Sequence, residues 1–368
     1  MDMEIELSII TSCAPEPIRG GGFLRWDQIN TKHVIERLQK ANVSASALDL
    51  YCFHFGDMGD SEDWHLFPAT ETQRLVDAVA TIADKDRAIH GVATKLATWA
   101  RPFNLRAFAT NLPAISSTNE QRRRKAVKAL WAVCQIADYL DVPCVEAVGG
   151  ADFGRWGSKD KWIIEASWQS YEERCHALLK SLHSLRTLMD RNEINGVAIA
   201  LELEPGPSYL LNSVCGRPFC GMQRPSALQR VMKELPAKYV GLNLDIGHFL
   251  RLEAVEPDLL AHVYSEYLDR VLHAHASRHT GIHGQDLYLR SEDYAECKRW
   301  LKVFCDSMSC DRDSVPTKTV AVELEACHRT EWIEKSLRIL RNWLEDKMGI
   351  STADPPENPP QQHLGSEV

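Results

Sequence analysis

The sequence predicts an α/β fold, a closed (β/α)8 TIM barrel. Strand-like and helix-like stretches alternate along its 368 residues, as expected for a parallel sheet with right-handed crossovers. No G-x-G-x-x-G or P-loop motif follows the first strand, which argues against a doubly wound open sheet. Four late strands end in carboxylate or imidazole side chains, and barrel enzymes place their chemistry at such ends. We expect one barrel domain over residues 1–350 and a disordered, Pro-rich tail over 351–368.

The first half of the chain contains four predicted strands, which are short, mainly apolar runs. They cover residues 7–12, 47–55, 105–112 and 143–150. Helices are predicted at 31–41 and 70–84, whereas residues 87–100 fit either an added strand or a helix.

The clearest helix precedes the fourth strand. Apolar residues recur there at helical spacing from Val127 to Leu140. Ser117 or Thr118 is expected to cap this helix, and Gln121 completes a capping box with Thr118.

The second half contains a helix at about 167–191, four further strands and a last helix at 330–348. The strands cover 196–207, 240–249, 270–277 and 318–326. Each apolar run leads into a pair of ionisable residues, which are Glu202 and Glu204, Asp245 and His248, His273 and His275, and Glu323 and Glu325. Burying a carboxylate at the end of an apolar strand is costly unless something pairs with it. Four such ends in series indicate a divalent cation at the barrel mouth.

Composition argues against several classes of function. The net charge of −9 and the isoelectric point of about 5.9 do not favour a nucleic-acid binder, which usually has a basic face. No apolar run reaches the roughly 18 residues of a membrane span, and the acidic N-terminus is unlike a signal peptide. The 11 scattered cysteines indicate free thiols in a reducing cytosol. We expect a cytoplasmic protein that acts on a small molecule and has no membrane or nucleic-acid partner. The sequence is compatible with assembly into a homo-oligomer.

The spacing of the ionisable residues defines the expected site. Residues i and i+2 of a strand face the same way, so each pair of glutamates shares one face. If the four strands are the fifth to eighth of a barrel, they form a half-ring whose carboxylates approach a central ion from well-separated sides. Three carboxylate oxygens and one imidazole suit Mn²⁺, Mg²⁺, Co²⁺ or Zn²⁺.

Four ordered motifs carry a family resemblance. They are A-L-E at 200–202 with E-P-G at 204–206, L-N-L-D-I-G-H at 242–248, H-A-H at 273–275 and V-A-V-E at 320–323. At these residues the sequence resembles the xylose isomerase-like barrel superfamily, which includes sugar isomerases, ketose 3-epimerases, inosose dehydratases and zinc apurinic-site endonucleases. The resemblance covers roughly residues 5–348, and the ordered set is more specific than any one motif.

The resemblance implies a set of site residues. It places the metal ligands on Glu202, Asp245, His275 and Glu323, and a substrate-contacting histidine on His248. Because both glutamate strands carry a second glutamate, Glu204 or Glu325 could be the ligand instead. The residues expected to bind substrate are Glu204, His273, Arg278, His283 and Glu325.

The implied activity is that of a divalent-metal-dependent isomerase or epimerase, or a related lyase, acting on a sugar, keto-sugar or polyol. The metal would act as a Lewis acid, Glu202 and Glu323 would move a carbon-bound proton, and His248 would hold a substrate hydroxyl. Two alternatives stay open. One is an apurinic-site endonuclease type of phosphodiesterase, and the other is a partner-dependent barrel subunit of a biosynthetic or glycoside-cleaving assembly.

Overall fold

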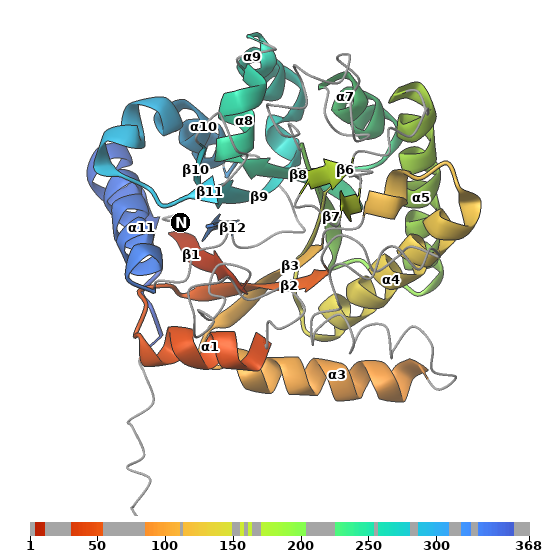
Figure 1. Cartoon of the computed structure of the whole chain (residues 1–368), viewed down its shortest axis with the longest axis horizontal. Helices are drawn as coiled ribbons and strands as arrows, with labels where there is room; N and C mark the ends of the chain where they lie inside the picture. The colour runs from red at the N-terminus through yellow and green to blue at the C-terminus, as the bar shows by residue number, and fades with distance from the viewer. Residues whose placement is uncertain are drawn as a thin grey trace, which may run out of the picture.

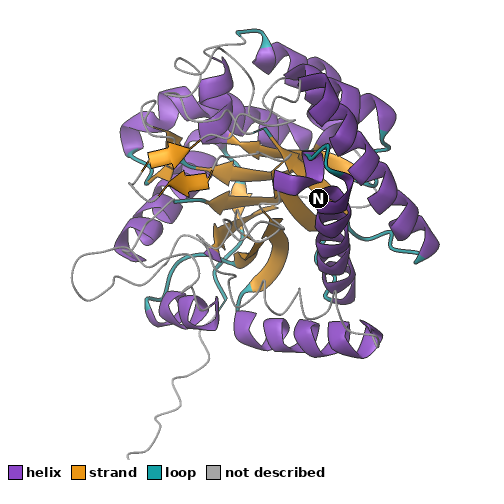
Figure 2. Ribbon diagram, turned by 45° about the vertical axis from the view of Figure 1, so that its right-hand side comes forward, coloured by secondary structure: helices purple, strands orange, loops and turns teal. Residues whose placement is uncertain are grey.

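A computed structural model of the chain describes its structure at residues 4–11, 31–53, 85–110, 113–148, 155–157, 161–163, 171–203, 225–253, 257–279, 286–308, 318–324 and 330–356. Eight parallel strands form a closed barrel in the order β12-β9-β8-β7-β4-β3-β2-β1, and the pairing of β12 with β1 closes it. These strands lie at the centre of Figure 1 and helices surround them, an arrangement that Figure 2 shows from another side. The predicted (β/α)8 barrel is confirmed.

The barrel strands are β1 (Glu4–Ile10), β2 (Ala47–Phe53), β3 (Asn104–Thr110), β4 (Cys144–Val148), β7 (Ala198–Glu202), β8 (Val240–Asp245), β9 (Val271–Ala276) and β12 (Lys318–Val322). The α-helices are α1 (Thr31–Lys40), α3 (Lys85–Ala100), α4 (Glu120–Tyr139), α5 (Tyr171–Arg191), α7 (Pro225–Glu234), α8 (Ile246–Glu253), α9 (Leu259–His262), α10 (Tyr294–Ser307) and α11 (Thr330–Asn342). Shorter elements are the antiparallel pairs β5 (Arg155–Gly157) with β6 (Lys161–Ile163) and β10 (Arg278–His279) with β11 (Asp286–Leu287), the strand β13 (Ser351–Thr352), and the helical turns Pro113–Ser116, Val263–Tyr267, Leu268–Arg270, Ser291–Asp293 and Trp343–Lys347.

Several local predictions are resolved by these bounds. Residues 87–100 lie in the helix α3, and the helix expected at 70–84 lies outside the described residues. The predicted cap of α4, Ser117 or Thr118, was wrong. The cap is Asn119, whose side-chain oxygen accepts a hydrogen bond from the backbone N–H of Gln121. Ser117 Oγ instead accepts a hydrogen bond from the backbone N–H of Asn119 and stabilises the turn before the helix.

The packed part of the chain extends past residue 350. Strand β13 pairs in parallel with the start of β1, and the Ala353 amide donates to the Ile5 carbonyl at 2.9 Å. The first residues of the segment assigned to the tail therefore pair with the sheet, and residues 357–368 lie outside the described part.

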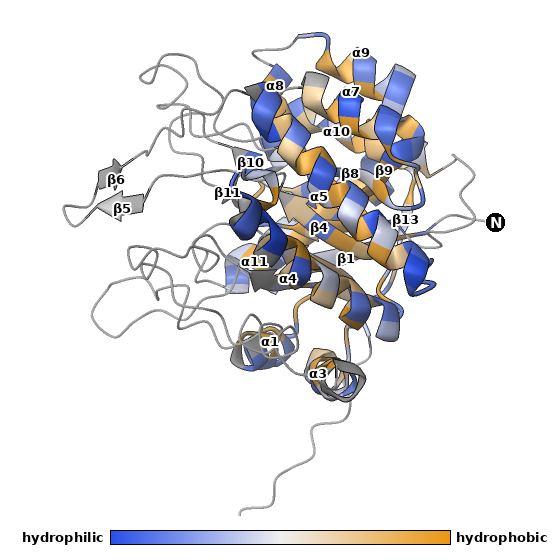
Figure 3. Cartoon of the chain, turned by 90° about the vertical axis from the view of Figure 1, so that its right-hand side faces the viewer, coloured by the Kyte–Doolittle hydropathy of each residue, from blue (hydrophilic) through white to orange (hydrophobic). Residues whose placement is uncertain are grey.

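Apolar side chains between the strands and the helices form the main core. Figure 3 shows strands that are mainly apolar and surrounding helices that mix apolar and polar residues, as expected when each helix buries one face. A separate small cluster fills the lower interior of the barrel and consists of Ala107, Cys144, Ala198, Ala200 and Leu272. Its small residues leave room for the polar side chains higher in the barrel.

A β-bulge in β9 sets which of its side chains point inward. Leu242 pairs with Val271 and Asn243 pairs with His273, so Leu272 is skipped in the register. Leu272 and His273 both face the interior as a result. Gly241 makes room for Leu272, because a Cβ at residue 241 would lie 2.4 Å from Leu272 Cγ.

Two further observations concern the described helices and cysteines. Among the described helices, none is long and apolar enough to cross a membrane. Cys134, Cys144, Cys175, Cys297 and Cys305 are buried and carry free thiols.

Buried Arg270 ties α7 to the start of β9. Its guanidinium donates to the carbonyls of Met232 at 3.3 Å and of Leu235 and Val240 at 2.8 Å. We expect Arg270→Ala to lower the free energy of unfolding by about 2–4 kcal/mol, because buried carbonyls at the end of a helix lose a charged donor. The control Arg338→Ala removes an exposed arginine, whose i,i+4 pair with Glu334 is worth less than about 1 kcal/mol. Denaturant unfolding of both variants tests this, and equal losses would contradict it.

Candidate metal centre

The structure brings together the four residues proposed as ligands. Glu202 is the last residue of β7, Asp245 is the last of β8, His275 lies near the end of β9, and Glu323 directly follows β12. One ligand atom from each lies within 4.8 Å of the other three. Because β7, β8, β9 and β12 are neighbours in the barrel, their carboxyl ends form the expected half-ring.

The imidazole of His275 lies at the centre of the three carboxylates. Its Nδ1 is 2.8 Å from Glu323 Oε2, 3.4 Å from Glu202 Oε2 and 3.9 Å from Asp245 Oδ2. Asp245 is fully buried, whereas the Glu323 side chain is 20% exposed. The cluster is therefore reached most readily from the side of Glu323.

Neighbouring donors fix the orientation of two carboxylates. The Asn243 amide donates to Glu202 Oε2 at 2.8 Å, and the backbone amide of His248 donates to Asp245 Oδ1 at 2.9 Å. His248 Nδ1 is 2.9 Å from Glu202 Oε1. His248 lies in the first turn of α8, so the D-I-G-H sequence places both its backbone N–H and its ring against the cluster.

The second oxygen of Asp245 shows that the cluster fits a cation. Asp245 Oδ2 is buried and accepts no hydrogen bond from any described residue. The nearest basic atoms of the described residues are His248 Nδ1 at 3.7 Å and His275 Nδ1 at 3.9 Å. A buried carboxylate oxygen without a donor is costly, and a divalent ion held by Glu202, Asp245, His275 and Glu323 would satisfy it.

The charges of the cluster are strongly coupled. Burial, together with the negative charges of Glu202 and Glu323, raises the pKa of Asp245 to about 7. Burial also opposes ionisation of Glu202, but hydrogen bonds and positive charge from His248 and His275 outweigh it and lower its pKa to about 2. Burial disfavours the imidazolium of His275, yet Glu146 and Glu323 raise its pKa well above the usual value. Protons thus partly neutralise the cluster when no cation does.

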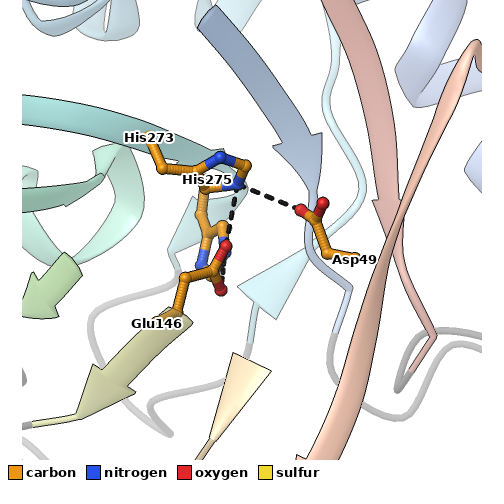
Figure 4. Close-up of side chains that lie close together, drawn as sticks. All are labelled: Asp49, Glu146, His273 and His275. Carbon is orange, nitrogen blue, oxygen red and sulfur yellow. Dashed lines mark hydrogen bonds and ion pairs between the residues drawn. The ribbon is translucent and has the colours of Figure 1, made fainter. Parts of the chain in front are cut away.

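A second polar cluster lies against the first, and sequence analysis recognised only part of it. Asp49, Glu146, His273 and His275 also have ligand-type atoms within 4.8 Å of one another (Figure 4). His273 Nε2 is 3.0 Å from Asp49 Oδ2 and 2.9 Å from Glu146 Oε1. Despite burial, these carboxylates raise the pKa of His273 to about 9.

The expected substrate-binding role of His273 does not fit this position. The side chain is 2% exposed and its Nε2 faces two carboxylates inside the barrel. Asp49 was missed, although it had the same signal as the other sites, a carboxylate within an apolar strand. Arg278 lies at the start of β10, where its Nε is 3.5 Å from Asp293 Oδ1. Glu204, His283 and Glu325 lie outside the described residues.

Comparison with known proteins identifies the family. A model of the xylose isomerase-like TIM barrel matches residues 13–343. The chain belongs to this family. Among curated proteins, no sequence matches it significantly.

Solved structures with the same fold are distant in sequence. A D-tagatose 3-epimerase-like protein superposes with a TM-score of 0.56 at 16% identity, covering 94% of this chain and 99% of its own. The IOLI protein with a bound zinc atom gives 0.52 at 14% identity, covering 93% and 97%. The apo form of a 3-keto-D-glucoside 4-epimerase from E. coli gives 0.51 at 12% identity, covering 92% and 100%. At these identities the likeness establishes the fold, and xylose isomerase-like barrels share it across different chemistries.

Gly247 keeps space beside Asp245. A Cβ at residue 247 would lie 2.5 Å from Ser277 Oγ and 3.3 Å from Asp245 Oδ1. We expect Gly247→Ala to displace these groups and to weaken divalent-metal binding about tenfold, the scale of effects from residues that support ligands. Gly91→Ala is the matched control, because open space surrounds residue 91 in α3. Competition titration with a metal indicator should show weaker binding in the first variant only, and equal affinity in both would contradict the argument.

Metal affinity is expected to rise with pH. Asp245, whose pKa is about 7, must ionise to bind a cation, and His275 must release the proton from the nitrogen that binds. Raising the pH removes these competing protons, so the affinity for Zn²⁺ or Co²⁺ should increase at least about tenfold per unit between about pH 6 and 7. Calorimetric titration in buffers of different ionisation enthalpy measures the released protons. Binding without proton release would show that these two groups are not ligands.

Proposed function

We propose that the chain is a divalent-metal-dependent isomerase or epimerase, or a related lyase, acting on a sugar, keto-sugar or polyol. The observation that carries the proposal is the pair Glu202 and Glu323 at the two ends of an arc of four adjacent strands, with Asp245 and His275 between them. Two carboxylates that approach one point from different directions are suited to removing a proton from one side of a carbon and delivering one to another.

The likeness to sugar epimerases supports the same class of substrate. Two of the solved structures described above are named as an epimerase or an epimerase-like protein. The family admits several reactions, so the choice among isomerase, epimerase and lyase is part of the proposal. A cation held by the four residues would supply Lewis-acid stabilisation of the negative charge that develops beside a carbonyl group.

The protein groups would divide the remaining work. Glu323 is the most exposed of the four and would contact an entering substrate first. Glu202 accepts a hydrogen bond from the Asn243 side chain, so its carboxylate stays fixed while a proton moves. His248 Nδ1, now 2.9 Å from Glu202, would hold a substrate hydroxyl and keep the reacting carbon near that carboxylate.

Proton exchange provides the test. Protein loaded with Mn²⁺, Mg²⁺, Co²⁺ or Zn²⁺ is expected to incorporate solvent deuterium at the carbon beside the carbonyl of at least one keto-sugar in a panel. Asp245→Asn should lose metal and exchange and keep its circular dichroism spectrum, because this ligand lies at the rim rather than in the apolar core. Asp258→Asn, a substitution outside the cluster, is the control.

Variants of the two glutamates test their role in proton transfer. Glu323→Gln and Glu202→Gln should each lower the exchange rate by at least about 100-fold, the scale of general base catalysis, when measured at saturating metal. Full exchange in metal-free protein, or in both glutamine variants, would rule out the proposed chemistry.

A further inference from the structure

Three polar side chains form a layer on the inner side of the metal centre. They are Asp49 from β2, Glu146 from β4 and His273 from β9, and all three are buried. Figure 4 shows the two imidazoles and the two carboxylates pointing toward one another. Their strands are separated along the chain, so barrel closure alone brings these groups together.

The ring of His275 connects this layer to the proposed ligands. Its Nδ1 faces Glu323, Glu202 and Asp245, whereas its Nε2 is 2.8 Å from Glu146 Oε2. A neutral imidazole carries its proton on one nitrogen and offers a lone pair on the other. An ionised carboxylate only accepts hydrogen bonds, so Glu146 holds the proton on Nε2 and leaves the Nδ1 lone pair toward the cation site.

Glu146 is itself held in place from several sides. Its Oε1 is 2.9 Å from His273 Nε2, which is 3.0 Å from Asp49 Oδ2. Asp49 Oδ1 accepts a hydrogen bond of 2.8 Å from Ser8 Oγ. Thr110 Oγ1 donates to the Glu146 backbone carbonyl at 2.7 Å. His273 from β9 therefore holds the carboxylate directly, Asp49 and Ser8 hold His273 in turn, and Thr110 from β3 fixes the Glu146 backbone.

We propose that Glu146 is a positioning residue that orients His275 and selects Nδ1 as its metal-binding nitrogen, with Asp49 and His273 holding Glu146. The proposal rests on the metal site of the proposed function and adds a role for residues outside the four ligands. A ligand imidazole whose other nitrogen donates to a carboxylate is a better electron donor and loses less freedom on binding. Removing that carboxylate should weaken the site without removing a ligand.

Glu146→Gln tests the proposal because it keeps the size of the side chain and removes the charge. We expect the affinity for Zn²⁺ and Co²⁺ to fall 10- to 100-fold in competition titrations. The visible absorption bands of bound Co²⁺ should also shift, because the donor strength and orientation of an imidazole ligand change. Asp49→Asn, which acts one step further away, should give a smaller loss.

Glu6→Gln is the matched control. Glu6 is also a buried glutamate of the barrel, but it pairs with Arg106 and accepts from Asn104 at 3.0 Å at the start of β3. This variant should lower the melting temperature, because it loses the ion pair with Arg106, and it should leave metal affinity and the Co²⁺ spectrum unchanged. A loss of affinity in Glu6→Gln equal to that in Glu146→Gln would mean that general destabilisation, not positioning, is responsible, and would overturn the proposal.

The remaining outcomes separate this inference from the proposed function. Unchanged affinity and Co²⁺ bands in a folded Glu146→Gln protein would overturn the positioning role, while the metal site and its chemistry would stand. The role would also be overturned if the wild type bound two equivalents and Glu146→Gln lost only one, with the other unaltered. If the wild type bound no divalent metal, the proposed function would fail first.

Discussion

The structure depends on how charge is compensated inside the barrel. Among the described residues, five carboxylates, which are Asp49, Glu146, Glu202, Asp245 and Glu323, meet three imidazoles, those of His248, His273 and His275. If all were ionised, two negative charges would remain, in surroundings where an unpaired charge costs several kcal/mol. A divalent cation would add two positive charges while His275 gives up one proton to bind it, so a single negative charge would remain. Protonation of Asp245 supplies part of the compensation without a cation.

The stability of the fold comes mainly from the apolar core between the strands and the helices, which surrounds this polar interior. Barrel interiors are commonly filled with layers of branched aliphatic side chains. Here the lower layer is mostly small, with Ala107, Ala198 and Ala200 beside Leu272, and ionisable groups occupy the space above. The bulky residues lie instead between the strands and the helices. Substitutions at the polar residues can therefore alter chemistry while the outer core keeps the barrel closed.

Sequence patterns were sufficient where the signal was local. An apolar run that ends in a carboxylate revealed Glu202, Asp245 and Glu323, because strand direction and burial follow from adjacent residues. The contacts of the inner layer required information that no short window contains, although Asp49 itself shows the local signal of a carboxylate within an apolar strand. His273 and Asp49 lie 224 residues apart in the chain, and His275 and Glu146 lie 129 apart, so their contact depends on how the barrel closes. The segment 87–100 was ambiguous for a different reason, because its apolar residues fit the spacing of a helix and that of a strand.

The bulge at Leu272 reverses the phase of side-chain alternation within β9. A regular strand that placed Leu272 in the lower interior would send residues 273 and 275 outward, toward the helices. The extra residue lets one strand supply an apolar side chain below and two imidazoles above. The effect of deleting one residue from β9 therefore depends on which residue is removed. Deleting Leu272 would restore regular pairing with both histidines still inside, whereas losing one residue between 273 and 275 would turn an imidazole away from its carboxylates.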